Sequence, residues 1–589
     1  MKTPNHLSRI TVLLSISGFQ LFSFSAFPQG SLTPPGAPAP TMKSLDQIEA
    51  RTPISTAPYN ISAPGSYYLT GNLTVSSGSA ITINAGGVTL DLNGFTISST
   101  ASSPGAAAIL IGGGLSKITI LNGSIEGGAT VSGSTWSGGN FSDGITFTGS
   151  VPKNVRITGL TINGFVGSGI YISSDHSSVV ESCIVQAAGV NGIRAPVVRN
   201  STAVICGLNG IVADEVSDSF GSAIASGGNG ISGTYSVINC GGSSSNSYGI
   251  VVSPGVVENS YGESSTGTGI SGYAVQNCNA VSNAGTALNG VTITNCYASN
   301  NSATNATITG TSVQSSYAVQ AGSGRCIDAG DVADSAASSQ FSGTTSAILI
   351  FAKNVSNTYV EALSASGATG IDADVVQNSW ATVTGNGSLG IAAQVSGLNC
   401  FGKVTAGNGG AILGTQLNNC YGASVSGLAI LGQNLMNCSG TSGPGGTGLA
   451  GNGAAPNISH CTAWMGNGGT GIDVSANAVV EDCVVVSATT AITVGSNCLI
   501  KGNDLNENSN GVVVSGTSNR IEANNGSCVA PGAAYVLNGT HNLIIANSAR
   551  DNGNNQYVLN ASPNSYGTIT NVSSGGVITT SDPRANLVY

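Results

Sequence analysis

The sequence predicts an all-β fold: a single-stranded parallel β-helix, a solenoid of roughly 18–23-residue coils closed by N- and C-terminal caps. Three observations favour it. A unit of this length recurs along the chain, its runs of β-branched residues are short and separated by Gly, Asn and Ser, and no segment has the apolar period of an amphipathic helix. Such a small unit buries its apolar face only by stacking on a copy of itself.

The repeat is clearest in residues 371–390, where Ile371 opens the unit and Asn378-Ser379 follows at the eighth position. Asn tolerates the left-handed conformation that a tight bend between strands requires. The same eight-residue step from an aliphatic residue to Cys, Ser or Thr begins at Ile193, Ile211, Ile270, Leu288, Ile308, Ile327, Ile350, Ile412 and Ile430. We therefore expect about 22 to 25 coils, which at ~4.8 Å per coil make a rod of roughly 110 Å.

Thirteen cysteines are present, and most of them occupy the Cys/Ser/Thr slot at the end of this step. These slot cysteines are Cys183, Cys240, Cys278, Cys296, Cys400, Cys420, Cys438, Cys461 and Cys483. Stacked side chains on adjacent coils lie about 4.8 Å apart, whereas a disulfide needs Cβ atoms about 3.8 Å apart. The pattern favours a ladder of buried free thiols, and a disulfide framework is the alternative for a secreted chain.

The motif V-x-N-C/S followed by G-x-G-x-x-G-I resembles the secreted bacterial right-handed parallel β-helix repeat proteins of the pectin-lyase-like superfamily, whose function is mostly unassigned. The resemblance covers about residues 61–560, and it implies architecture rather than chemistry. We expect one domain over 44–589. Its N-terminal cap and first coils lie at about 61–100, and its C-terminal cap at 542–589, because an open end of a β-helix is an exposed sheet edge.

The N-terminal residues have the composition of a secretory signal peptide. Lys2 and Arg9 precede an apolar stretch from Ile10 to Phe27, so we assign 1–27 to the signal peptide and 28–43 to a proline-rich linker. This predicts a secreted protein, extracellular or at the cell surface, with the periplasm as the alternative. No further segment predicts a membrane span.

The charge balance narrows the class of partner. Only 7% of the residues are charged, and the net charge of −10 becomes 14 − 26 = −12 once Lys2 and Arg9 are removed with the signal peptide. An acidic chain disfavours nucleic acid, anionic membranes and, without a bridging cation, polyanionic polysaccharides. A polysaccharide or cell-surface glycan is the expected partner, and we expect a monomer.

One outward face could carry a site. With Ile371 directed inward, strand alternation directs Asp372 and Asp374 outward. Alignment of the eight-residue steps places Phe351 and Lys353 in the same columns one coil earlier, and Asp328 another coil earlier.

Asp328, Lys353, Asp372 and Asp374 are therefore weak candidates for a sugar-binding or catalytic site, and Asp372 and Asp374 for Ca²⁺ ligands. A solvated polar patch is the plain alternative. No other cofactor is expected.

Two further groups of residues are weaker candidates. Arg194 and Asp214 fall in neighbouring columns of consecutive coils, as a surface ion pair or a second polar site, with Arg156, Arg199, Glu215 and Asp218 nearby. Trp380 and Tyr421 follow the repeat slot on separate coils and could stack on sugars.

The catalytic sets of the superfamily are incomplete in this sequence. The resemblance implies acidic Ca²⁺ ligands and an Arg or Lys base for its lyases, and Lys353 with Asp372 and Asp374 matches part of that set, but the columns hold no Arg. The Gly-His-Gly and Arg-x-Lys of its hydrolases are absent. We therefore expect a structural, adhesive or glycan-binding protein, and the alternative is an extracellular polysaccharide lyase or glycoside hydrolase.

Overall fold

The computed structural model describes residues 50–589 except 173–174, 342, 344–346, 363–365, 530, 551–555 and 573–576. The predicted signal peptide (1–27) and linker (28–43) lie outside the described residues. Residues Arg51–Tyr589 form one compact unit.

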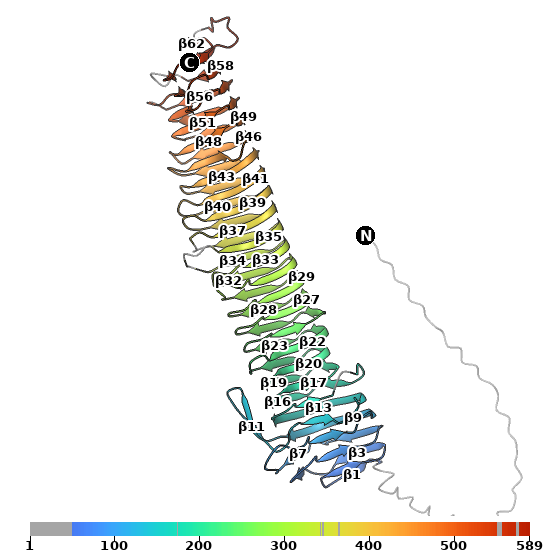
Figure 1. The fold of residues 1–589 in the computed structure, drawn as a ribbon. Coiled ribbons are helices and arrows are strands. Elements are labelled where there is room, and N and C mark those ends of the chain that lie inside the picture. The colour runs from blue at the N-terminus through green and yellow to red at the C-terminus, as the bar shows by residue number, and fades with distance from the viewer. Residues whose placement is uncertain are drawn as a thin grey trace, which may run out of the picture. The chain divides into compact units, whose positions relative to one another are not determined.

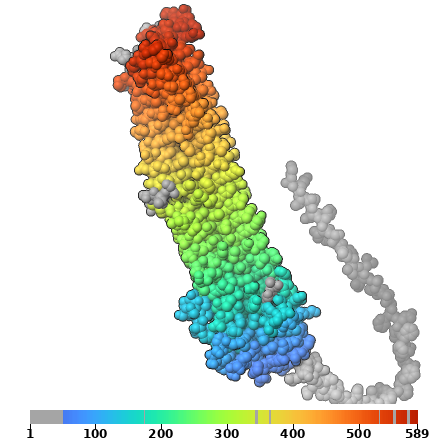
Figure 2. Space-filling view, in the orientation of Figure 1, coloured from blue at the N-terminus to red at the C-terminus, as the bar shows by residue number. Residues whose placement is uncertain are grey.

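This unit is a parallel β-solenoid of about 24 turns, which confirms the predicted fold class (Figure 1). The elements of the described residues are all β-strands, and none of these residues forms a helix able to cross a membrane. Successive turns pair in parallel, as in the ladder β27 (Ile270–Gln276), β29 (Leu288–Thr294), β31 (Ile308–Gln314) and β33 (Ile327–Ala333). One antiparallel hairpin, β10 (Ala129–Ser132) with β11 (Thr135–Gly138), projects near the N-terminal end (Figure 2).

A representative turn consists of a long strand, a one-residue bend and a short strand. Strand β37 (Thr369–Gln377) ends at Asn378, whose φ of 47° is left-handed, and Ser379 then leads into β38 (Trp380–Val383). The bend recurs at Asn239, Asn259, Asn277, Asn295, Asn357, Asn399, Asn419 and Asn437, all with positive φ. Asparagine suits this position because its short polar side chain lowers the cost of the left-handed region.

The interior consists of columns of like residues. Ile350, Ile371, Ile391 and Ile412 pair in register from turn to turn, and each is at most 1% exposed. All thirteen cysteines are buried and free, so the predicted thiol ladder is confirmed. The thiols of Cys278 and Cys296 interact directly, as do those along the run Cys400, Cys420, Cys438, Cys461 and Cys483.

The regular pairing of strands extends further toward both ends of the chain than the repeat that was recognised in the sequence. Strand β1 (Thr52–Ile54) already pairs with β3 (Gly65–Leu69). At the other end, β58 (Leu543–Ile545) and β60 (Tyr557–Leu559) still add to the stack, and β63 (Asn586–Val588) pairs with β59 (Ser548–Ala549). The segment 542–589 therefore begins with regular strands and ends with β63 over the last turn.

Candidate functional site

The predicted acidic face, formed by Asp328, Lys353, Asp372 and Asp374, has the register that was predicted by aligning the eight-residue steps of successive coils. Asp328, Phe351 and Asp372 are opposed on β33, β35 (Ile348–Ser356) and β37. Lys353 lies opposite Asp374, because the residues on either side of the two are paired. These side chains form two adjacent outward columns across three turns.

Only part of this face encloses a hollow. Phe351, Lys353, Asp372 and Asp374 line an open depression of about 520 Å³, together with Gln394. The Gln394 side-chain amide donates a hydrogen bond of 3.0 Å to Asp372. Asp328 lies on the preceding turn and does not line the depression.

Asp328 has a partner that the column alignment missed. Arg325 forms an ion pair with Asp328, and its guanidinium lies 4.2 Å from the centroid of the Phe351 ring. Arg325 precedes its strand, where strand alternation no longer fixes the direction of a side chain. Its position three residues before Asp328 was the only sequence signal available. The face thus carries an arginine after all, although outside the two columns.

Asp372 and Asp374 of this face were predicted to be Ca²⁺ ligands. Among the described residues, no group of three or more His, Cys, Asp or Glu side chains is arranged to hold a metal ion. Ca²⁺ takes six to eight oxygen ligands. Asp372 and Asp374 would supply only part of such a shell, and Ca²⁺ binding there stays a prediction.

The second predicted cluster is divided among separate pairs. The Arg194 guanidinium lies 5.4 Å from the centroid of the Tyr171 ring, whereas Asp214 pairs with His176 at 2.8 Å. Arg156 pairs with Glu181 at 3.1 Å. Arg194 and Asp214 therefore have different partners, and the expected ion pair between them was wrong.

A larger feature runs along the short strands of the regular block. The residue directly after each slot begins a short strand and is directed outward, and these residues pair in register. Over the nine turns from Tyr261 to Tyr421, seven of these residues are aromatic, the exceptions being Asn279 and Ala336. We call Tyr261, Tyr297, Tyr317, Tyr359, Trp380, Phe401 and Tyr421 the aromatic column.

Most rings of the aromatic column are exposed, and rings on adjacent turns contact one another. Six of them are 37–46% exposed, and Phe401 is half-buried between two neighbours. Ring centroids are 5.7 Å apart for Tyr297 and Tyr317, and 4.0 Å apart for Trp380 and Phe401. Sequence reasoning singled out only Trp380 and Tyr421. The other five aromatic residues could have been found in the sequence, because each directly follows a Cys, Ser or Thr of the slot.

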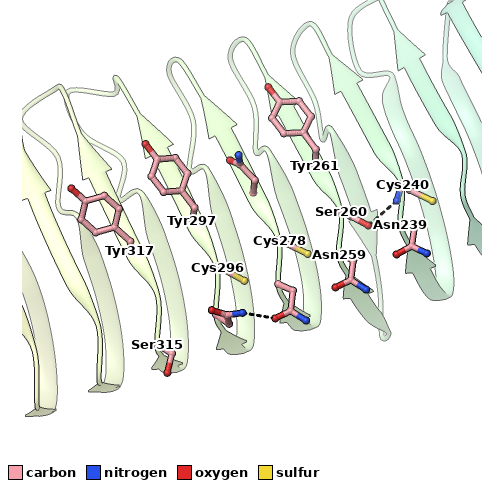
Figure 3. Close-up of a pocket in the computed structure, with 13 residues that line it drawn as sticks. Asn239, Cys240, Asn259, Ser260, Tyr261, Cys278, Cys296, Tyr297, Ser315 and Tyr317 are labelled. Atoms are coloured by element: carbon pink, nitrogen blue, oxygen red, sulfur yellow. Dashed lines mark hydrogen bonds between the residues drawn. The ribbon is translucent and has the colours of Figure 1, made fainter.

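A second column, of bend asparagines, runs beside the aromatic column. Between the two lies an open groove of about 640 Å³ over residues 239–317, with Tyr261, Tyr297 and Tyr317 on one side and Asn239 and Asn259 on the other (Figure 3). The asparagine side chains are linked from turn to turn, as where Asn295 donates a hydrogen bond of 2.7 Å to Asn277.

The other side of the aromatic column is also polar. Trp380 donates a hydrogen bond from Nε1 to Thr382 at 3.2 Å, and the Tyr421 and Thr441 hydroxyls are 3.4 Å apart. A hydrogen bond to the Glu263 carboxylate raises the pKa of Tyr261 to about 12, so its hydroxyl stays protonated at physiological pH. The rings therefore lie in a polar frame, and Phe401 stacks between the rings of Trp380 and Tyr421.

These features define a class: a parallel β-solenoid with an outward aromatic column and a separate acidic depression. No protein-family model matches the chain, and no curated protein sequence matches it. Among solved structures, it is similar to the A-module of the Azotobacter vinelandii mannuronan C-5 epimerase AlgE6, at 12% identity and a TM-score of 0.19 over 72% of this chain and 91% of that one.

Two other solved structures show comparable similarity. The AlgE4 A-module from the same organism matches at 11% identity and a TM-score of 0.17, over 74% of this chain and 88% of that one. PfbA, a surface adhesin of Streptococcus pneumoniae, matches at 10% identity and a TM-score of 0.14, over 82% and 84%. Similarity this low says nothing about activity.

Proposed function

We propose that this chain is a secreted or cell-surface β-helix protein that binds glycans without transforming them, and that the aromatic column is its binding surface. The single observation that carries the proposal is the alignment of seven outward aromatic rings within nine turns. Sugar rings have apolar C–H faces and hydroxyl edges, so they match aromatic faces bordered by hydrogen-bonding groups.

Structural need alone does not account for these rings. Each is directed away from the core, and the turns beneath it are also held by backbone pairing and buried aliphatic residues, to which a ring–ring contact adds only about 0.5–1.5 kcal/mol. Singly exposed apolar side chains are ordinary on protein surfaces, but contiguous ones mark interaction sites. The low charge of the chain and the polar frame of the column favour an amphipathic partner over a polyion.

Retention on polysaccharides tests this proposal. The purified chain without residues 1–27 is incubated with a panel of insoluble and soluble polysaccharides, and bound protein is measured by sedimentation and affinity electrophoresis. We expect retention on at least one polysaccharide, and loss of most of it in the Trp380→Ala/Phe401→Ala double variant. Tyr273→Ala is the matched control, because Tyr273 is 58% exposed and lies on the long strand β27, away from the aromatic column. Absence of retention on every member of the panel contradicts glycan binding.

One observation favours a second function, that of a polysaccharide lyase or glycoside hydrolase. Arg325 lies against Asp328 and Phe351, and Lys353 lines the depression with Asp372 and Asp374, so cationic and acidic groups adjoin on one face. A general acid and a general base are the groups that such chemistry requires.

Product analysis distinguishes the two functions. The protein is incubated with uronic-acid and neutral polysaccharides, with and without Ca²⁺, and unsaturated and reducing-end products are measured. The binding function predicts no product above a heat-denatured control. Product formation that disappears in Asp372→Ala would instead establish an enzyme and place its site in the acidic depression.

A further inference from the structure

The thiol ladder places cysteines on directly consecutive turns. Cys278 and Cys296 form one pair, each two residues after strand residues that pair in register, and Ser260 and Ser316 fill the slot on either side of the pair. A longer run without interruption consists of Cys400, Cys420, Cys438, Cys461 and Cys483. In the pair and in the run, each thiol therefore has another thiol as its neighbour along the solenoid axis.

The sulfur atoms of these cysteines occupy equivalent positions from turn to turn. The Cys278 Sγ lies 3.1 Å from the carbonyl oxygen two residues before it and 3.5 Å from a carbonyl oxygen of the preceding turn. The Cys296 Sγ has the same two contacts at 3.2 and 3.5 Å. Cys420 and Cys438 repeat both contacts at 3.3–3.5 Å. Neighbouring sulfur atoms are therefore separated by one turn, which is about 4.8 Å.

This separation matches a metal ion held between two sulfur atoms. Metal–thiolate bonds are about 2.3 Å long, as for Zn²⁺, so two thiolates on opposite sides of one ion lie about 4.6 Å apart. Thiolates favour soft ions such as Cu⁺, and Cu⁺ and Ag⁺ bind two sulfur ligands in a line. Structural Zn²⁺ takes four ligands, whereas among the described residues no group of three or more His, Cys, Asp or Glu is arranged to hold a metal ion. The ladder therefore suits a soft monovalent ion rather than zinc.

The pair is also within reach of a small ion. Cys278 and Cys296 line the open groove of about 640 Å³, on adjacent turns between the bend asparagines and the tyrosines (Figure 3). They are only 3% and 4% exposed, which excludes a bulky reagent, but a monatomic ion needs to reach only the two sulfur atoms. A hydrogen bond from the Cys278 thiol lowers the pKa of Cys296, so the two sulfur atoms already share a proton that a cation can replace.

We propose that neighbouring thiols of the ladder bind soft monovalent metal ions, Cu⁺ or Ag⁺, one ion between two sulfur atoms, and that Cys278 and Cys296 form the site open to the groove. Two thiol protons leave for the solvent as two metal–sulfur bonds form, and no group is oxidised or reduced. The resulting S–M–S unit carries one negative charge. Backbone N–H groups directed at the sulfur atoms stabilise this charge, as where Cys438 donates to the Cys461 Sγ at 3.4 Å.

Silver binding tests the proposal. The chain without residues 1–27 is reduced, freed of reductant and titrated anaerobically with silver nitrate in chloride-free buffer, and bound metal is measured after desalting. We expect about three ions per chain, because the pair takes one and the run of five takes two. The melting temperature should rise, since an ion that binds the folded chain stabilises it. Parallel titration with Cu⁺ against a competing chelator distinguishes which of the two ions binds more tightly.

Serine substitutions locate the ions. Cys278→Ser should remove about one of the three ions, because it leaves Cys296 without a partner thiol. The variant should fold, since serine fills the same slot in the neighbouring turns. Cys326→Ser is the matched control, because burial rather than a neighbouring thiol raises the pKa of Cys326, and it should leave the number of bound ions unchanged. X-ray absorption of the silver-loaded chain should show two sulfur neighbours for each ion.

Three results would overturn the proposal. One is the absence of bound silver or copper in the folded chain. Another is a count that approaches all thirteen thiols while the melting temperature falls, which would show that the ions unfold the chain and react with every cysteine. The third is an equal loss of ions in Cys278→Ser and Cys326→Ser, or an equal number of bound Zn²⁺ ions. None of these results bears on glycan binding, which the aromatic column carries.

Discussion

At the scale of single residues, the slot at the end of the eight-residue step holds side chains that are small and can be buried. Cys, Ser and Thr fill it, and Cys278, Cys420 and Cys438 are at most 3% exposed there. The same role was predictable from sequence because Ser and Thr substitute for Cys at a fixed step from Ile or Leu. Cys206, Cys326 and Cys528 are also buried, although they lie outside the slot.

Buried thiols should be unreactive in the native protein. Burial raises the pKa of Cys206 and of Cys326 to about 12, so neither forms the reactive thiolate near neutral pH. We expect almost no reaction with a charged disulfide reagent at pH 8 in native buffer, and reaction of all thirteen thiols in denaturant. A count below thirteen in the unfolded chain would indicate disulfides and contradict the free-thiol structure.

The same pKa shift makes stability depend on alkaline pH. A thiol whose pKa rises from 9.0 to about 12 on folding contributes stability that is intact below pH 9 and is lost as the pH rises toward 12. The loss is about 1.4 kcal/mol per pH unit for one such thiol. In urea unfolding between pH 8.5 and 10.5, Cys326→Ser should therefore lose stability less steeply than the native sequence. Parallel curves would contradict this.

At the scale of the elements, the inward and outward alternation of side chains along each strand decided which residues of the candidate site could be predicted from the sequence. The eight-residue step placed Asp328, Phe351 and Asp372 in one column, and the structure has that register. Arg325 lies before its strand, where no period applies. Most of the aromatic column was not predicted for another reason. The turns differ in length, so the aromatic residues have no constant spacing in the sequence and align only when each position is counted from the slot of its own turn.

The bend between the two strands is a sensitive point of each turn. Asn399 has a φ of 53° and donates a hydrogen bond to Asn378. Asn399→Ala should lower the free energy of unfolding by about 1–2 kcal/mol, from left-handed backbone strain and the loss of two hydrogen bonds, the one donated to Asn378 and the one accepted from Asn419.

Asn399→Gly is the matched control, since glycine adopts this φ without strain but also lacks the amide. Urea unfolding of both variants separates the two causes. A glycine variant no more stable than the alanine variant would show that backbone conformation does not limit stability at this bend.

At the scale of the whole molecule, the described solenoid has two ends, and its C-terminal end is closed by β63 pairing with β59. The repeat made the stack predictable, but the closure lies where the repeat fades. Residues 542–547 (N-L-I-I-A-N) still repeat the pattern of 519–524 (N-R-I-E-A-N), and residues 542–549 form β58 and β59 in register with earlier turns. The register persists there because the buried side chains of Asn542 and Asn547 accept hydrogen bonds from the backbone N–H groups of Asn519 and Asn524, both at 2.9 Å.

Removal of the closing segment should cause self-association. A chain truncated after residue 560 loses β61 (Ser565–Tyr566), β62 (Ile569–Asn571) and β63, which leaves the edges of β58 and β59 unpaired. Unpaired strand edges template pairing with another chain. We expect oligomers in light scattering, with circular dichroism still typical of β-structure. A folded, monodisperse truncated chain would contradict this role of the segment.

The identical register of neighbouring turns also has an evolutionary consequence. Because each turn meets the next through the same columns of residues, a tandem duplication of one turn inserts a copy whose upper and lower surfaces already fit its neighbours. Duplication of a turn that carries a ring would also lengthen the aromatic column by one ring. A lineage could thus adjust the reach of this protein by whole-turn gains and losses without redesigning its interior.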